Sequence, residues 1–553
     1  MSQEKKISGN LVDIVNETIY PATIEIEDGK IAAIHRKEGE EKNFLLPGFV
    51  DAHVHIESTM LPPSEFARLA LPHGVIATVS DPHEIGNVLG VAGVEYMLQN
   101  AAEVPFKFNF GAPSTVPASN FETSGARIGP EEIRYLLSKK TIKYLTEVMN
   151  FPAVINRDPE MMAKIAIAKE LHKKIDGHAP LLSGRDLEKY ASAGIDTDHE
   201  CVSIKEAKEK IACGMKILIR EGSAARDFEA LFPLLLDAPE HCMLCSDDID
   251  PEMMLHGSIN LLVKRAIQGG ANLMSILRCA SLNPIQHYGL EVGLLRVGDP
   301  ADFIEVDNLK EFNVLSTYVN GECVYKDKEI QFPRNTPQLV NHFNVEKKQP
   351  GDFAVPAGQG RIKVMEAIDG KLLTTASLIE PLIYEEFAIA DPSRDILKIA
   401  VVNRYENKQP SVGFIKNFGL KKGAIASSVA HDSHNIIVVG TSDELLAKAV
   451  NCIIAHQGGL CVVDDSSEEC LPMPIAGLMS DQEGPEVAKQ YKKLEALAKS
   501  LGSPLAAPFM TLSFMALVVI PHLKISDLGL FDGDTFSLTE LYEYGATPLR
   551  RSA

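Results

Sequence analysis

Short apolar runs that end in polar residues recur through the middle of the chain. Eight of them are found, at residues 49–55, 75–82, 106–113, 144–150, 173–180, 195–200, 216–223 and 241–248. Between them lie stretches with the spacing of amphipathic helices, such as IKEAKEKIACG at 204–214. Eight strand–helix units over about 245 residues predict an α/β fold of the closed (β/α)₈ TIM-like type, with catalytic groups at the carboxyl ends of the strands. An open, doubly wound sheet is disfavoured, because no GxGxxG sequence follows the first strand.

A different pattern flanks this region. Residues 11–35 alternate in short apolar stretches, with Asp28-Gly29 where a two-residue hairpin turn belongs. The same alternation of short apolar stretches recurs at 301–307 and 316–325, where Asn320-Gly321 is another hairpin signal. We therefore expect one sheet domain built from both sides of the barrel segment. The expected domains are 1–45 and 291–345 for this sheet, 46–290 for the barrel, and 350–553 for a C-terminal mixed α/β domain.

Composition narrows the class of protein. The 553 residues exceed what one hydrophobic core supports, and 75 acidic against 54 basic side chains give a net charge of −21. This charge would repel nucleic acid and anionic membranes. The nine cysteines lack a disulfide framework spacing, and the longest apolar run, 509–520, is too short to span a bilayer. The amino terminus has no apolar signal segment, so we expect a cytoplasmic enzyme without a membrane partner, and a homodimer by default.

The ends of the predicted strands carry metal-ligand residue types. His53 and His55 lie two residues apart on the first strand, so both imidazoles enter the barrel interior at its mouth. Such a pair is either a metal clip or two hydrogen-bonded core histidines, and the later strands favour the metal. The expected ligand set is His53, His55, Glu147, His178, His199 and Asp247. It exceeds the three protein ligands of a single catalytic zinc, so we expect two cations bridged by Glu147.

Paired divalent cations generate hydroxide near neutral pH, which predicts hydrolysis as the reaction class. Asp247, beside the metals, can accept the hydroxide's proton and pass it to the leaving group. Glu200, next to His199, is either a second acid or base, or a carboxylate that opens the next helix and suits its dipole. Asp248 is expected to cap a helix or support a ligand rather than to bind metal.

Two further polar groups are candidates for the barrel mouth. His83 and Glu84 follow the second strand, where they either hold an extra metal, contact substrate, or belong to a turn stabilised by Asp81-Pro82. His431 and His434, in the C-terminal stretch AHDSHN, form either an additional metal site that caps the mouth or a solvated loop.

Several motifs resemble those of the bacterial adenine deaminases, within the amidohydrolase superfamily. They are PGFVDAHVHIEST (47–59), SDPHEIGN (80–87), GHAP (177–180), DHE (198–200), CSDD (245–248), AHDSHN (430–435) and IPHLKISDLGLFD (520–532). The resemblance implies conversion of adenine to hypoxanthine and ammonia by a metal-bound hydroxide, in purine salvage. It implies two divalent ions, with Mn²⁺ or Fe²⁺ favoured and Zn²⁺ compatible, and a β-sandwich form for the flanking sheet domain. Glu147 then stands where wider superfamily members bridge their metals with a carbamylated lysine.

In the mechanism that the resemblance implies, a carboxylic acid protonates a ring nitrogen while hydroxide attacks C6 of the purine. From their placement next to the predicted ligands, we expect Asp247 to be the proton shuttle and Glu200 to be the ring-nitrogen acid. Arg220, Ser223 and Ser246 are candidates for contacting the purine edge. Two alternatives stay open: another amidohydrolase acting on a cyclic amide or N-acyl substrate, and a catalytically inactive barrel that serves as an assembly protein. The second would be expected to lack some ligands, and here each expected position is filled.

Overall fold

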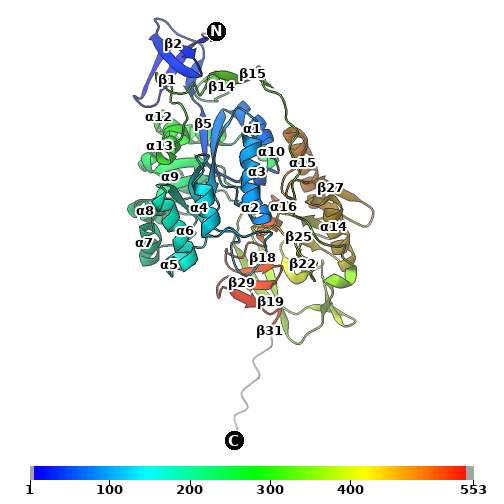
Figure 1. The fold of residues 1–553 in the computed structure, drawn as a ribbon. Helices are drawn as coiled ribbons and strands as arrows, with labels where there is room; N and C mark the ends of the chain where they lie inside the picture. The colour runs from blue at the N-terminus through cyan, green and yellow to red at the C-terminus, as the bar shows by residue number, and fades with distance from the viewer. Residues whose placement is uncertain (1–4, 224, 544–553) are drawn as a thin grey trace.

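The computed structural model describes residues 5–223 and 225–543, and within them the middle of the chain forms two curved parallel sheets (Figure 1). Each strand coincides with one of the eight apolar runs. One sheet has the order β5 (Phe49–Val54), β6 (Val75–Ser80), β7 (Lys107–Ala112), β8 (Ile142–Val148) and β9 (Lys174–Gly177), and the other has β10 (Thr197–Asp198), β11 (Lys216–Arg220) and β12 (Cys242–Cys245).

Hydrogen bonds at two seams join these sheets into a ring. At one seam the Asp247 amide donates to the His53 carbonyl at 2.9 Å, beside a parallel bridge between Val54 and Asp247. At the other, the Asp196 amide donates to the Ile175 carbonyl at 3.2 Å. The described strands therefore close into a TIM-like barrel, as the sequence predicts.

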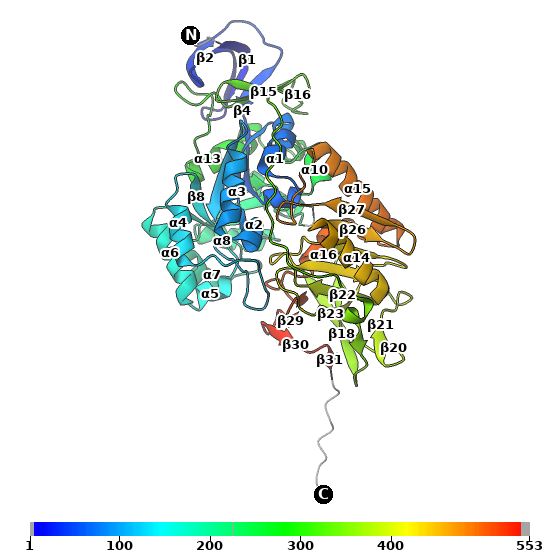
Figure 2. The same ribbon diagram turned by 45° about the vertical axis from the view of Figure 1, so that its right-hand side comes forward.

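Helices follow the strands and surround the ring (Figures 1 and 2). They are α1 (Pro63–Ala70), α2 (His83–Leu89), α3 (Val91–Ala101), α4 (Pro130–Leu137), α5 (Phe151–Ile155), α6 (Pro159–Glu170), α7 (Gly184–Ser192), α8 (Ile204–Ala212), α9 (Phe228–Asp237), α10 (Pro251–His256), α11 (Ile259–Gln268), α12 (Leu273–Leu277) and α13 (Asn283–Tyr288). Polar caps begin several of them, and the Asp158 carboxylate and the Ser203 hydroxyl accept the first free amides of α6 and α8.

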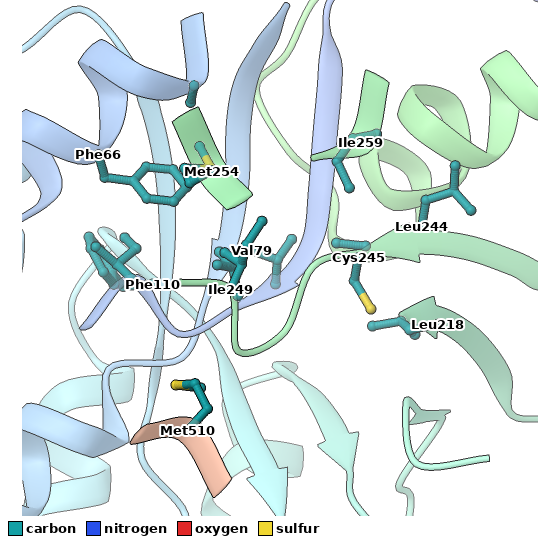
Figure 3. Packing of buried hydrophobic residues seen from close by; sticks show 14 of the residues in the cluster. Phe66, Val79, Phe110, Leu218, Leu244, Cys245, Ile249, Met254, Ile259 and Met510 are labelled. Carbon is teal, nitrogen blue, oxygen red and sulfur yellow. The ribbon is translucent and has the colours of Figure 1, made fainter. Parts of the chain in front are cut away.

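The barrel core continues into the C-terminal part of the chain. Every residue of β5 and β6 is buried, as expected for parallel strands covered on both faces. Figure 3 shows Val79 and Phe110 from the barrel strands beside Phe66, and Met510, on α16 (Pro508–Phe514), belongs to the same cluster. Each such fully buried side chain contributes about 1.5–3 kcal/mol, so the shared core holds the C-terminal part against the barrel.

Segments from both sides of the barrel build one eight-stranded sheet. Its order is β16 (Glu329–Ile330), β15 (Glu322–Lys326), β14 (Val314–Val319), β13 (Phe303–Val306), β4 (Phe44–Pro47), β1 (Lys5–Asp13), β2 (Thr18–Glu27) and β3 (Lys30–Arg36). Asp28-Gly29 and Asn320-Gly321 form the predicted hairpin turns, with all four residues at positive φ. The sandwich form of this domain stays a prediction.

The C-terminal part is built on a second large sheet. Its main path is β19 (Thr374–Ile379), β18 (Arg361–Ala367), β23 (Ser411–Lys416), β22 (Leu397–Val402), β25 (Ile436–Gly440), β24 (Ala424–Ser427), β26 (Gly459–Val463) and β27 (Glu468–Pro472), and β31 (Tyr542–Glu543) pairs with β18. Helix α14 (Asp443–His456) packs on β24, β25 and β26, while α15 (Gly484–Ser500) packs against α10 of the barrel. Two small sheets complete this part: β17 (Val355–Pro356), β21 (Phe387–Ile389) and β20 (Leu382–Tyr384), and β28 (Leu523–Ser526), β29 (Gly529–Asp532) and β30 (Ser537–Thr539).

The predicted domain boundaries stay predictions, and residues 1–4 and 544–553 of the outer domains lie outside the described residues. The apolar run 509–520 is almost entirely buried, as expected for a core segment. In the described part of the chain, no helix has the length and apolar character that crossing a bilayer would need.

Candidate metal centre

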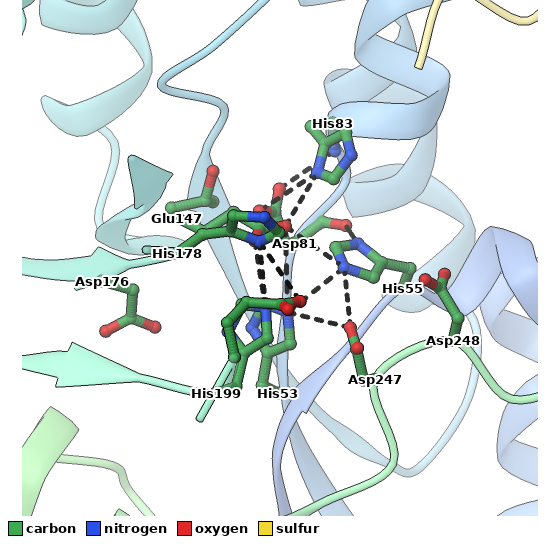
Figure 4. A network of polar contacts seen from close by, with 12 residues as sticks. His53, His55, Asp81, His83, Glu147, Asp176, His178, His199, Asp247 and Asp248 are labelled. Carbon is green, nitrogen blue, oxygen red and sulfur yellow. Dashed lines mark hydrogen bonds and ion pairs between the residues drawn. The ribbon is translucent and has the colours of Figure 1, made fainter. Parts of the chain in front are cut away.

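Two imidazoles from the first barrel strand form one side of a buried cluster at the barrel mouth (Figure 4). His53 ends the inward-facing row of β5 and His55 follows it, with 3.2 Å between their Nε2 atoms. His55 Nδ1 lies 3.2 Å from the Asp81 carbonyl oxygen, which can accept a hydrogen bond from a protonated Nδ1. That contact favours the tautomer whose Nε2 lone pair faces the cluster, as in many metal-binding histidines.

Glu147, near the end of β8, lies between two groups of imidazoles. Its Oε1 is 3.3 Å from His55 Nε2, and its Oε2 is 2.7 Å from His178 Nδ1 and 3.2 Å from His199 Nε2. Burial raises the pKa of this carboxyl group, but His199 and His178 lower it well below its usual range, so Glu147 is ionised. One carboxylate thus faces imidazoles from β5 on one side and from the ends of β9 and β10 on the other.

Asp247 closes the cluster at the end of β12. Its Oδ1 is 3.2 Å from His55 Nε2 and 3.5 Å from His53 Nε2. Its Oδ2 accepts a hydrogen bond from Arg220 Nη1 at 2.9 Å. Burial raises the pKa of Asp247, but hydrogen bonds with His53 and His55 lower it well below its usual range. The structure therefore brings together all six residues of the expected ligand set.

Arg220 links Asp247 to Glu200, the second predicted acid or base. Its Nη1 and Nη2 both donate to the Glu200 carboxylate, with Nη2 to Oε2 at 2.9 Å, and its Nε donates to Asp227 at 2.8 Å. Burial raises the pKa of Glu200, but Arg220, His178 and His199 together lower it further, so the net shift is downward. Glu200 is therefore held in place by a bidentate ion pair rather than exposed at a helix start, since α8 begins only at Ile204.

A buried ion pair fixes the backbone that carries His178 and His199. Asp198 accepts hydrogen bonds from the amides of Ala179 at 3.0 Å and Glu200 at 2.8 Å, the residues that follow the two histidines. Lys210, on α8, lies 3.0 Å from the same carboxylate and is fully buried. The ends of β9 and β10 are thus tied to one another through Asp198.

The C-terminal loop between β24 and β25 reaches the barrel mouth through Glu84. His431 Nδ1 lies 2.8 Å from Glu84 Oε1, and His434 Nε2 contacts the other carboxylate oxygen. His83 lies between the two groups, with Nδ1 3.5 Å from Glu147 and Nε2 3.3 Å from Glu84. The structure therefore places all four additional residues named from the sequence at the mouth, next to the predicted ligands.

The cluster opens into a cavity whose wall comes from both parts of the chain. The barrel supplies imidazoles and carboxylates, and the C-terminal part supplies Leu372, His431, Asp432, Phe514 and Leu517. The His431 and Phe514 rings stack with centroids 4.6 Å apart. The buried Lys524, on β28, donates to the carbonyls of Leu372 at 2.7 Å and Phe514 at 2.9 Å, which fixes this wall.

Arg220, Ser223 and Ser246, the predicted contacts to the purine edge, form hydrogen bonds with other groups of the protein. Arg220 is engaged by three carboxylates, as described above. The Ser246 hydroxyl donates to Asp51, and the Ser223 hydroxyl oxygen accepts the Asp250 amide at 2.8 Å. Asp248 accepts a hydrogen bond from Ser58 at 2.5 Å, and its predicted supporting role stays a prediction.

Sequence reasoning did not find the apolar wall, Lys210 or Lys524. Phe514 lies within the apolar run 509–520, where nothing distinguishes a cavity residue from core. Lys210 has the same neighbours in sequence as an ordinary surface lysine of an amphipathic helix. Asp81, whose carbonyl oxygen contacts His55, could have been named from the sequence. It follows the second strand directly in SDPHEIGN, where residues of a barrel site are expected.

Two family models match the chain. The amidohydrolase family matches residues 44–324, and the adenine deaminase C-terminal domain matches residues 371–537. The first range contains the whole barrel, and the second contains the loop that carries His431 and His434.

Full-length relatives agree with these matches. The chain is 55% identical to the adenine deaminase of Sulfurovum sp. (strain NBC37-1), over 96% of this chain and 98% of that protein. It is 51% identical to the adenine deaminase of Salinibacter ruber, over 97% and 98%. Among solved structures, the β-aspartyl dipeptidase of Fervidobacterium islandicum AW-1 has a TM-score of 0.46 at 15% identity, over 60% of this chain and 99% of that one. At such identity to the full-length relatives, the chain belongs to the adenine deaminases of the amidohydrolase family.

Proposed function

We propose that this protein hydrolyses adenine to hypoxanthine and ammonia. Its relatives from Sulfurovum and Salinibacter are adenine deaminases by name. The observation that supports this most directly is the position of Glu147, whose two oxygens lie within 3.3 Å of imidazoles from three separate barrel strands. A carboxylate surrounded in this way is suited to bridging two cations at the carboxyl ends of the strands.

Amidohydrolases have a divalent metal centre, and the cluster at the barrel mouth fits one. Four imidazoles and two ionised carboxylates are crowded together in a buried site, a donor set that suits divalent transition metals. Among the described residues, His53 Nδ1 and His178 Nε2 are buried without a hydrogen-bond partner. We infer two ions, Mn²⁺ or Fe²⁺ most favoured and Zn²⁺ compatible, held by His53, His55, Glu147, His178, His199 and Asp247. Such ions would lower the pKa of a water molecule towards neutrality.

Asp247 is proposed as the proton shuttle. Because its pKa is far below neutrality, it enters the reaction ionised and can accept the proton that the attacking water loses at C6 of the purine. Its Oδ2 hydrogen bond from Arg220 Nη1 orients the carboxylate. The same oxygen atoms can then deliver the proton to the departing amino nitrogen, which leaves as ammonia.

Glu200 is proposed to protonate a ring nitrogen, and the structure adds that it starts from the ionised form. Its ion pair with Arg220 keeps it ionised, so it must take up a proton before it can donate one. A carboxylate that cycles between base and acid meets this need, since the reaction itself releases protons from water. Arg220 holds Glu200 and Asp247 together and so couples the two proton carriers.

The apolar wall is proposed to cover the purine. Leu372, Phe514 and Leu517 bring uncharged surface to a cavity that is otherwise lined by charged groups. A flat aromatic ring gains from such contact, and the wall also excludes bulk water from the reacting carbon. We include His83, Glu84, His431 and His434 in the site, with the Glu84, His431 and His434 group as a further set of candidate ligands.

The activity is tested by incubating the purified chain with Mn²⁺ and adenine and measuring hypoxanthine and ammonia. We expect equimolar formation of both products, and turnover for His199→Asn far below that of the wild-type chain. His256→Asn is the matched control, because His256 is exposed on α10 and should leave the rate unchanged. A chain that leaves adenine intact but hydrolyses a cyclic amide or an N-acyl amino acid would overturn the proposal. The homodimer and the cytoplasmic location stay predictions.

A further inference from the structure

Three cysteines and a histidine meet where the end of α14 lies against the edge of the C-terminal sheet. Cys452 and His456 are one turn apart on α14, so both face the same side of the helix. Cys461 on β26 and Cys470 on β27 are directly opposite one another in an antiparallel pair, so their side chains share a face of the sheet. Cys452 and Cys461 belong to the hydrophobic cluster between α14 and the sheet, and the partly buried Cys470 packs against it.

The spacing of the donor atoms fits a single ion. Cys452 Sγ is 4.0 Å from His456 Nδ1, and the ligand atoms of Cys452, His456 and Cys470 all lie within 4.8 Å of one another. In a tetrahedral zinc site, sulfur and nitrogen ligands are about 3.6 Å apart, given metal–ligand distances of about 2.3 and 2.05 Å. The group therefore needs only a small contraction to surround an ion.

Two backbone contacts at this position are the ones that an ion would replace. The Cys461 thiol donates to the Ala449 carbonyl oxygen at 3.3 Å, and His456 Nδ1 lies 2.9 Å from the Cys452 carbonyl oxygen. The thiolate is the form of cysteine that binds metals. Cys452 is buried, Cys470 is partly exposed and His456 is exposed, so an ion can enter from solvent.

We propose that Cys452, His456 and Cys470, with Cys461 as the fourth ligand, bind one thiophilic divalent ion such as Zn²⁺. Binding displaces the thiol protons of the three cysteines into solvent and involves no redox change. Three thiolates and one imidazole form a closed ligand set, which is typical of structural rather than catalytic zinc. The site is separate from the cluster at the barrel mouth, whose donors are imidazoles and carboxylates only, and it does not depend on the proposed function.

The ion would fasten α14 to the edge strand β27. Helix α14 packs on β24 and β25, and the loop between these strands carries His431 and His434 to the barrel mouth. The proposed site thus stabilises the sheet from which the capping loop projects, on the side of α14 that faces β26 and β27.

Cobalt separates this site from the barrel centre, because only sulfur ligands give an intense sulfur-to-cobalt charge-transfer absorption. The full chain is reduced, treated with a chelator, and titrated with Co²⁺. We expect the absorption to reach its maximum at one equivalent of sulfur-bound cobalt per chain, and to be lost on competition with Zn²⁺. Cys470→Ser and Cys452→Ser should lose the band, whereas Cys213→Ser, at the end of α8, should keep it.

The wild-type protein provides a test that does not depend on the folding of a variant, since Zn²⁺ should protect three of its nine thiols from a thiol reagent. Zn²⁺ should also raise the thermal midpoint of the wild-type chain by more than that of His456→Ala, which keeps only the barrel centre. Wild-type protein that folds but gives no charge-transfer band would overturn the proposal. So would a band that persists in Cys470→Ser, or a Cys461–Cys470 disulfide that survives the reductant. Loss of adenine turnover alone has no bearing on this site.

Discussion

Lys210 tests how the barrel keeps two of its histidines in position. Its ammonium group is fully buried and lies 3.0 Å from Asp198, 2.9 Å from Glu206 and 2.7 Å from the Ala179 carbonyl. Lys210→Met keeps the aliphatic stem and removes the charge. Asp198 is then left as a buried carboxylate without its cation.

The expected cost is large. Removing one partner of a buried ion pair destabilises a protein by about 3–5 kcal/mol, because the other charge stays desolvated. For a domain of this size, this corresponds to a fall of about 6–20 °C in the thermal midpoint. Because Asp198 holds the amides next to His178 and His199, we also expect turnover to fall by about 10–100-fold, as for other groups that orient metal ligands.

The matched control lies on the same helix. Lys208 pairs with Asp237 at 3.3 Å with both side chains more than half exposed, so Lys208→Met should change the stability by less than about 1 kcal/mol. Calorimetry and urea unfolding give both values, and adding Asp198→Asn to Lys210→Met should recover part of the loss. If Lys210→Met were as stable and as active as Lys208→Met, the positioning role of this pair would be refuted.

Three further outcomes are expected. Arg220→Lys keeps a charge but loses the bidentate pair with Glu200, so adenine turnover should fall by about 10–100-fold; an unchanged rate would contradict the proposed coupling. Burial lowers the pKa of Lys524 to about 7, so above that pH the unfolded chain binds a proton that the folded chain lacks. The stability contributed by this lysine should rise with pH between about 7 and 10.4, by up to about 1.4 kcal/mol per pH unit, and unfolding curves of Lys524→Met should lack this slope. Glu84→Gln should destabilise the contact with His431 by about 1–3 kcal/mol and lower turnover, and a chain that unfolds and reacts as the wild type does would argue against a role for this contact.

The barrel and the cluster were predictable because their signals are local. Each strand is a short apolar run, and each ligand stands at a fixed place relative to that run, so strand periodicity alone directs His53 and His55 inward. The hairpin turns were predictable for the same reason, since Asp28-Gly29 and Asn320-Gly321 suit positive φ. A Cβ atom at Gly29 would lie only 2.9 Å from the Asn320 carbonyl oxygen, so the two turns also lie against each other, which their sequences do not reveal.

Contacts between distant segments left no such signal. Glu84 and His431 are separated by 347 positions, and the sequence left open whether the AHDSHN loop caps the mouth or is solvated, because no local pattern pairs this loop with α2. Lys208 and Lys210 lie on different faces of α8, and the sequence does not reveal that packing buries the Lys210 face against Asp198. The cysteine cluster likewise depends on the register of β26 with β27 and on the docking of α14, neither of which can be read from the spacing of the cysteines.

The central claim is that cations held at the barrel mouth are required for adenine deamination, and metal analysis combined with turnover tests it most directly. The measurement uses the Cys452→Ser variant, so that the proposed thiolate site does not contribute to the metal content. We expect about two divalent ions per chain, no turnover after chelation, and recovery in proportion to the Mn²⁺ or Fe²⁺ restored. A metal-free chain that converts adenine to hypoxanthine at the full rate would contradict the claim.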